Sequence, residues 1–325
     1  MWLRSQRDSG MRGLGAYGRG ERGRTATNVD YALWTIRGFR HRLPDSNAST
    51  ITWKCLKGVG SASIRSIGVF VTEIKPDNKA DAGYWNSFYQ AMGFRVADPA
   101  DPVRQFLEKF IPGDAEGSCL EVGCFPGRFL AVGGELGYEL SGIDFADRFP
   151  DMQAWLQKSG YRCGQFLNQD FFTLSPEPKF DVVMSFGFIE HFENYEAAIE
   201  RHIQWLKPGG LLILEAPNFA SGIQWVLHAL LDSENLKRHH LPAMYPKRWA
   251  NLAKKYGMTV LYQGYFGGYQ FWAEEDRRSR LAQKILNKVM KITHRLQRIA
   301  WPDCRWYSPY AGLVARKGSA PIQRY

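Results

Sequence analysis

The stretch SCLEVGCFPGRFL, residues 118–130, combines a short apolar run with two glycines and a proline. A run of this length is typical of a buried strand, and Gly123 and Gly127 mark a tight turn before a helix. Glycines at such a turn let the backbone approach a ligand closely, and the next helix offers its N-terminal N–H groups. A plain structural turn has the same features. The surrounding sequence is therefore needed to distinguish a ligand-binding turn from a purely structural one.

Apolar runs alternate with helical stretches around this turn. Short apolar strands separated by helices indicate an α/β fold with a mostly parallel sheet covered on both faces. We predict strands near 118–123, 138–143, 162–167, 180–186 and 210–216, with a final β-rich pair at 259–272 and 310–316. We predict helices near 82–93, 101–111, 127–136, 149–159, 194–206 and 246–256.

Acidic residues follow several of these strands. The predicted strand in YELSGIDFA ends in Asp144, 17 residues after Gly127, where a carboxylate is well placed to accept hydrogen bonds from a ribose diol. Asp170 follows the third strand in NQDFF, before aromatic residues that suit an adenine ring, and FDVVMSFGFIEHFEN ends in a turn at the same crevice. In open α/β sheets, ligands bind at the carboxyl ends of the strands, where the strand order reverses. The sequence therefore predicts a nucleoside site at this edge.

With these segments the chain resembles the class I S-adenosylmethionine-dependent methyltransferases. The resemblance runs from about Tyr84 to Lys317 and rests on LEVGCFPGRF, GIDFA, NQDFF, FDVVMSFGFIEHF and LKPGGLLILEAPN. It implies a Rossmann-like, seven-stranded, mostly parallel sheet that ends in an antiparallel hairpin, and S-adenosyl-L-methionine as the cofactor. An NAD-binding turn fits less well, because the spacing of the glycines differs.

The resemblance also assigns roles to single residues. Glu121, Gly123 and Gly127 would line the methionine end of the cofactor, Asp144 would hold the ribose, and Phe186 with Gly187 would border the other side. Phe125 departs from the family, which usually has a glycine there, and predicts a bulkier wall beside the cofactor. The predicted cofactor-binding residues are Glu121, Gly123, Cys124, Gly127, Asp144, Phe145, Asp170, Phe171, Phe186 and Gly187.

Catalysis by methyl transfer needs alignment, and a hydroxyl acceptor also needs a proton acceptor. The candidates are His191, directly after the fourth strand, and His239 in ENLKRHHLPAMYP. The alternatives are a histidine packed at the pocket rim for His191 and a solvated loop for His239. Some O-methyltransferases of the superfamily carry Glu-x-x-Glu-His after the fourth strand, but Gly187 replaces the first glutamate here, so we predict no metal.

The domain organisation is predicted in three parts. Residues 1–72 carry 12 basic and 4 acidic residues of a chain with net charge +10, and form a disordered or artefactual basic extension. Residues 73–112 form an N-terminal helical lid, and 113–325 form the methyltransferase domain. Within that domain, residues 219–246 resemble the acceptor-side insertion of bacterial methyltransferases of polysaccharide and cell-surface biosynthesis, and residues 274–306 form a basic helical insertion.

The segment 277–301 is predicted as an amphipathic helix with a basic stripe. Its predicted apolar face consists of Leu281, Ile285, Val289, Ile292, Leu296 and Ile299. It either docks on its own domain or lies on anionic lipid, as would suit a membrane-carried acceptor. A nucleic-acid partner is not expected, since no RNA-binding module accompanies the stripe. The oligomeric state is left open.

The sequence thus favours methylation, at oxygen, of a small-molecule, glycan or lipid-linked acceptor. An RNA methyltransferase and a non-catalytic scaffold of the same fold remain alternatives. Five scattered cysteines give no disulfide framework and fit a reducing cytoplasm, with the inner membrane face as an alternative peripheral site.

Overall fold

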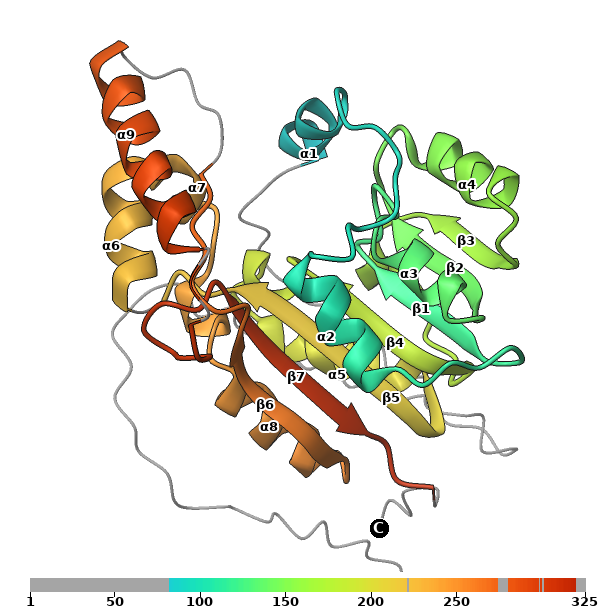
Figure 1. Ribbon diagram of the computed structural model, residues 1–325. Coiled ribbons are helices and arrows are strands. Elements are labelled where there is room, and N and C mark those ends of the chain that lie inside the picture. Colours follow the sequence, from blue (N-terminus) through green and yellow to red (C-terminus); the bar gives the residue numbers. More distant parts are fainter. Residues whose placement is uncertain (1–81, 221, 274–279, 298, 300, 320–325) are drawn as a thin grey trace, which may run out of the picture. The chain divides into compact units, whose positions relative to one another are not determined.

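The computed structural model describes residues 82–220, 222–273, 280–297, 299 and 301–319, all within the unit Val69–Tyr325. The predicted extension 1–72 and the first part of the predicted lid lie outside the described residues. At the centre is a seven-stranded sheet in the order β3-β2-β1-β4-β5-β7-β6 (Figure 1). The strands are β1 Ser118–Val122, β2 Glu139–Asp144, β3 Cys163–Asn168, β4 Phe180–Phe186, β5 Leu206–Pro217, β6 Thr259–Phe266 and β7 Tyr310–Arg316.

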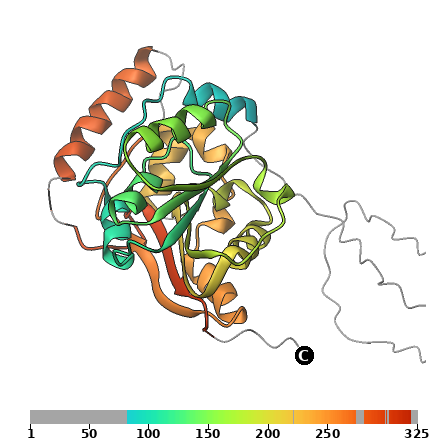
Figure 2. The same ribbon diagram turned by 90° about the vertical axis from the view of Figure 1, so that its right-hand side faces the viewer.

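The strands β1 to β5 are parallel, and β7 runs antiparallel between β5 and β6. One face of the sheet packs against α2 (Pro102–Phe110), α3 (Leu130–Glu135) and α4 (Phe149–Lys158). The other packs against α5 (Tyr195–Trp205) and α8 (Pro246–Lys255), and in Figure 2 the strands run between these two layers. This arrangement confirms the predicted fold class.

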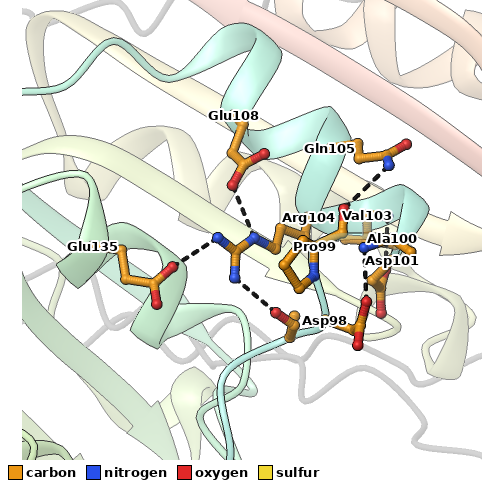
Figure 3. A network of polar contacts seen from close by, with 10 residues as sticks. Asp98, Pro99, Ala100, Asp101, Val103, Arg104, Gln105, Glu108 and Glu135 are labelled. Carbon is orange, nitrogen blue, oxygen red and sulfur yellow. Dashed lines mark hydrogen bonds and ion pairs between the residues drawn. The ribbon is translucent and has the colours of Figure 1, made fainter.

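Local chemistry fixes where α2 begins and how it meets α3. Oδ1 of Asp101 accepts a hydrogen bond from the N–H of Val103 at 2.8 Å and caps the helix, as the Asp-Pro pair predicts. Arg104 then donates to the carbonyl of Ala97 and forms ion pairs with Glu108 and, at 2.9 Å, with Glu135 of α3 (Figure 3). These contacts tie α2 to α3 on one face of the sheet.

The strand order places the functional edge of the sheet. After β1 the chain builds β2 and β3 on one side and then returns to β4 on the other side of β1. The order therefore reverses between β1 and β4, which pair directly, with Glu121 opposite Met184. Four further helices gather where the parallel strands end (Figure 1): α1 Ala82–Tyr89, α6 Gly222–Leu231, α7 Ser233–Lys237 and α9 Arg280–Leu296.

Two predicted elements differ from the structure. The strand predicted over 259–272 ends at Phe266, because Tyr269 and Phe271 leave the sheet and bury their rings elsewhere. In α9 the buried positions include Leu286 and Thr293, whereas Ile292, predicted on the apolar face, is 51% exposed. The buried side of the helix therefore overlaps the predicted face at the half-buried Val289 and Leu296 but is turned toward Leu286 and Thr293. No helix in the described part of the chain is long and apolar enough to cross a membrane.

Candidate active site

The turn after β1 closes tightly around two glycines. The N–H of Gly123 donates to the carbonyl of Ile143 on β2 at 2.8 Å, and the N–H of Gly127 donates to the carbonyl of Cys124 at 2.6 Å. Both glycines have positive φ, 70° and 84°, and a Cβ on Gly123 would lie 2.7 Å from the ring of Phe188. Position 123 thus requires glycine for two reasons, conformation and space.

Asp144, at the end of β2, joins that strand to the turn. Its Oδ2 accepts a hydrogen bond from the N–H of Phe125 at 3.0 Å, and its Oδ1 accepts one from the N–H of Ala146 at 2.9 Å. Burial raises the pKa of Asp144, and these two hydrogen bonds act in the opposite direction. Each carboxylate oxygen has a second lone pair, so Asp144 can also accept hydrogen bonds from a bound diol.

Asp170 and Phe171 follow β3. Oδ1 of Asp170 accepts a hydrogen bond from the N–H of Phe172 at 2.9 Å and caps the short helix η1, Phe171–Thr173. Phe171 is buried and meets the ring of Phe188 edge-on, with 5.7 Å between centroids. The third strand end therefore presents an acid and an aromatic ring, as the NQDFF segment predicts.

Phe125, the residue that departs from the family, is buried beneath the N-terminal helix. Its ring centroid lies 4.7 Å from that of Tyr89 in α1 and 5.8 Å from that of Phe94, in an edge-on arrangement with the latter. The side chain is 4% exposed. It lines the cavity described next, and it also fastens α1 over the turn.

One cavity of about 1520 Å³ opens at the ends of β1, β2 and β4. Both predicted catalytic residues, His191 and His239, line it. Gly127 does not; a Cβ there would meet Met152 of α4 at 2.9 Å, so this glycine serves the packing of the turn. The predicted cofactor residues that do line the cavity are Glu121, Gly123, Cys124, Asp144, Phe145, Asp170, Phe171, Phe186 and Gly187.

The two histidines have the same local arrangement. Nδ1 of His191 lies 3.1 Å from the carbonyl oxygen of Arg238, and Nδ1 of His239 lies 2.7 Å from that of Asn235. Because a carbonyl only accepts, each Nδ1 carries the proton and each neutral ring keeps its lone pair on Nε2. Burial lowers the pKa of His191 to about 4 and that of His239 well below its ordinary value, so both rings are neutral at pH 7.

The structure brings the two rings together from segments far apart in the sequence. Their centroids are 4.7 Å apart, and Trp85 of α1 covers His191 edge-on at 5.0 Å. His239 is 9% exposed and packs against Phe219 at 4.9 Å, so the solvated loop considered for it is not found. The predicted insertion 219–246 thus delivers His239 to the fourth strand end.

Buried carboxylates surround the same cavity. Burial raises the pKa of Glu121 and Glu190 well above the ordinary value and that of Glu215 to about 8. Oε2 of Glu121 and both oxygens of Glu190 have no hydrogen-bond partner among the described residues. Glu215 was not predicted from the sequence, although a lone glutamate inside the apolar run LLILEAP was a usable signal. Burial therefore favours the neutral form of these groups unless a positively charged ligand lies beside them.

A family model described as a methyltransferase domain matches residues 93–263, more than half of the chain. The chain therefore belongs to this family, the S-adenosylmethionine-dependent methyltransferases of the class I fold. S-adenosylmethionine is the cofactor, and the cavity fits it. Glu121 offers an unpartnered buried oxygen to a cationic ligand, and Asp144 has lone pairs to spare for a diol.

Solved structures of the same fold are distant in sequence. A putative methyltransferase from Bacillus halodurans is 17% identical, with 66% of this chain and 98% of that chain covered and a TM-score of 0.48. An S-adenosylmethionine-dependent methyltransferase from Archaeoglobus fulgidus is 19% identical, with 66% and 93% covered and a TM-score of 0.44. Coclaurine N-methyltransferase, bound to N-methylheliamine and S-adenosylhomocysteine, is 13% identical, with 66% and 71% covered and a TM-score of 0.44. No curated protein matches the chain.

Proposed function

We propose that this enzyme methylates an oxygen atom of a small-molecule, glycan or lipid-linked acceptor. The observation that carries the proposal is the pair of neutral imidazoles, His191 and His239, on the cavity that the cofactor residues also line. A hydroxyl must lose a proton when its oxygen takes the methyl group, whereas a neutral amine attacks with less help. Two lone-pair donors at the acceptor side therefore favour a hydroxyl.

The acceptor space lies between α1 and the insertion 219–246. The guanidinium of Arg238 stacks over the ring of Tyr84 at 4.3 Å, which joins the two walls. Arg148 donates to the carbonyls of Tyr89, Gln90 and Met92 and holds the end of α1 against α4. Since S-adenosylmethionine supplies an electrophilic methyl group on sulfur, these walls contribute mainly by alignment and by excluding water.

The size and charge of the cavity favour a compact acceptor. A single drug-sized ligand occupies pockets of roughly 300–1,000 Å³, so 1520 Å³ leaves room for cofactor and acceptor together. Aromatic side chains such as Trp85 and Trp272 suit a sugar face or a planar ring. The lining offers three arginines beside six acidic residues, so it has few cationic partners for a phosphate backbone. These residues are Arg95, Arg128 and Arg238, and Glu121, Asp144, Asp147, Asp170, Glu190 and Glu215.

The test uses S-adenosylmethionine with a ¹³C-labelled methyl group and the full-length protein. Separate fractions of polar metabolites, lipid-linked glycans and RNA are offered, and NMR of the product assigns the methyl to oxygen or nitrogen. We expect O-methyl product in one of the first two fractions, with transfer lowered in His239→Asn but not in His202→Asn. Label on nitrogen or in RNA alone contradicts the proposal. Cofactor binding without transfer to any fraction favours the scaffold alternative.

We further propose that α9 contacts an anionic membrane surface. Ile292 is 51% exposed among the exposed side chains of Lys288, Lys291 and Arg295. Exposed apolar residues beside basic ones are typical of interfacial helices. In α6 the side chains of Ile223, Trp225, Val226 and Leu230 are exposed as well.

Vesicle flotation tests this contact with matched charge changes. We expect the wild-type protein to float with vesicles that contain phosphatidylserine, and the triple variant with Lys288, Lys291 and Arg295 changed to Gln to float less. The control changes three exposed lysines of α8, Lys247, Lys254 and Lys255, to Gln. Equal flotation of both variants contradicts a specific role of α9.

A further inference from the structure

Three side chains of metal-ligating type meet on one wall of the cavity. Glu190 and His191 belong to the short helix η2, Ile189–His191, and His239 follows α7. One ligand atom from each lies within 4.8 Å of the others, and Nε2 of His191 is 3.8 Å from Oε1 of Glu190. The N–H of His240 donates to the carbonyl of Glu190 at 2.6 Å, which fixes the two segments together. The cluster is thus held by backbone contacts.

Glu190 is the least expected member of this cluster. Its side chain is fully buried, and neither carboxylate oxygen has a hydrogen-bond partner among the residues that the structure describes. A buried polar group without a partner costs free energy, and the nearby buried Glu215 adds electrostatic repulsion. Both features point to a cationic partner for Glu190.

The histidines are oriented as metal ligands usually are. Such histidines bind the ion through one ring nitrogen and donate the other N–H to a carbonyl or carboxylate. In His191 and His239 the Nδ1 groups have carbonyl partners already, those of Arg238 and Asn235. In this tautomer Nε2 of each ring keeps its lone pair, and the ring of His191 has a further hydrogen bond with the backbone of Gly187.

We propose that Glu190, His191 and His239 bind a divalent first-row transition-metal cation, of which Zn²⁺ is the type, and that this cation holds the acceptor hydroxyl. The role rests on the O-methylation proposed above, whereas the site itself does not. The expectation of no metal came from Gly187, which stands where a further glutamate would be. The proposal departs from that expectation because His239, from a distant segment, lies beside Glu190 and His191.

The geometry fits such an ion after a small contraction. Zn²⁺ binds imidazole nitrogen and carboxylate oxygen at about 2.0–2.2 Å, so tetrahedral ligand atoms lie about 3.3 Å apart. The observed separations, 3.8 Å and up to 4.8 Å, require side-chain shifts of about 1 Å. Two imidazoles and one carboxylate favour Zn²⁺, Fe²⁺ or Co²⁺ over Mg²⁺. Three protein ligands also leave a position open, as catalytic sites do.

An open position changes the chemistry of the acceptor. With the cation bound, Nε2 of His191 and of His239 are its ligands, so the cation replaces them as the group that assists deprotonation. A hydroxyl bound to the cation releases its proton to solvent more readily than a free one. Its oxygen then attacks the methyl group: the C–O bond forms, the S–CH₃ bond breaks, and that electron pair remains on sulfur. The products are the O-methylated acceptor, S-adenosylhomocysteine and one proton.

The experiment measures metal binding directly on the full-length, tag-free protein after treatment with a chelator. Co²⁺ is titrated by visible absorption and Zn²⁺ by calorimetry, without cofactor or acceptor. We expect one tightly bound ion, no competition from equal Mg²⁺, and affinity lowered by about 10- to 100-fold or more in Glu190→Gln and His239→Asn. His202→Asn, which removes another buried imidazole away from the cluster, is the control and should bind like the wild type.

Circular dichroism checks that each variant is folded. If a variant is not folded, the wild-type titration alone still tests whether the protein binds the metal ion. The site is overturned if the wild type binds no Co²⁺ or Zn²⁺, if Mg²⁺ competes equally, or if folded His239→Asn binds as tightly as the wild type. Failure of the proposed function has a different signature, namely cofactor binding and a Co²⁺ spectrum without methyl transfer. Loss of transfer with chelator and recovery with Zn²⁺ would support the role.

Discussion

Replacing Asp144 by asparagine separates the cofactor role of this carboxylate from its structural role. Asp144 already accepts one backbone hydrogen bond on each oxygen, from Phe125 and from Ala146. In Asp144→Asn the new side chain would keep the shape of the old one but only one acceptor oxygen. Its amide nitrogen would then face one of the two backbone N–H groups, and the ribose would lose at least one acceptor.

The magnitudes follow from these contacts. Hydrogen bonds to a charged group contribute about 1.5–3 kcal/mol, so the loss of one should weaken S-adenosylmethionine binding about 10- to 150-fold. A buried N–H left facing a donor should lower the free energy of unfolding by about 1–3 kcal/mol. Asp144→Asn leaves the side-chain volume nearly unchanged, so no cavity adds to these values.

Isothermal titration calorimetry gives the Kd, and urea denaturation gives the free energy of unfolding. The control is Asp181→Asn. In the wild type the Asp181 carboxylate accepts hydrogen bonds from the N–H of Ser118 at 2.9 Å and from Lys207 at 2.8 Å, and Asp181 does not line the cavity. We expect the control to lose some stability and no cofactor affinity. A Kd for folded Asp144→Asn within about threefold of the wild type would refute the ribose role.

Two further changes test the packing around the site. Phe125→Ala removes a buried ring that contacts Tyr89. It should lower the free energy of unfolding by about 3–5 kcal/mol in urea denaturation and weaken cofactor binding in calorimetry. A decrease in the free energy of unfolding below about 1 kcal/mol would contradict the anchoring role of Phe125. His202 is fully buried, and burial lowers its pKa to about 4. The unfolded chain protonates this histidine near pH 6.5, so the free energy of unfolding should fall by up to about 3 kcal/mol between about pH 6.5 and about pH 4. In urea denaturation at a series of pH values, His202→Asn should show a shallower fall than the wild type. Parallel curves for the two proteins would contradict the role of His202 in this pH dependence.

Most of the sheet and the cofactor side of the cavity follow from local sequence. The strand β1, its two-glycine turn and Asp144 form a short segment, and their roles depend on strand ends that any parallel sheet brings to one edge. The capped start of α2 is equally local, since Asp101 and Pro102 act within one helical turn. For such features, spacing along the chain determines position in space.

The proposed acceptor side of the cavity depends on contacts that no local pattern contains. His191 and His239 are 239 − 191 = 48 positions apart, and only the path of the insertion after β5 brings them together. The proposed metal ligands likewise come from two distant segments, whereas the expectation of no metal was drawn from one local motif, in which Gly187 replaces a glutamate. The rotation of α9 is another tertiary effect, because its amphipathic pattern does not determine which of its residues meet the domain.

The position where the chain departs from its family also explains how the two halves of the cavity are connected. A glycine at position 125 would leave the turn bare, whereas Phe125 gives α1 a ring to pack on through Tyr89. The same helix reaches the proposed acceptor side, where Trp85 covers His191 and Tyr84 meets Arg238. Because one helix contacts both sides, cofactor that stabilises the turn should also stabilise α1 over the histidines. Binding of S-adenosylmethionine would thereby help to close the acceptor site before transfer.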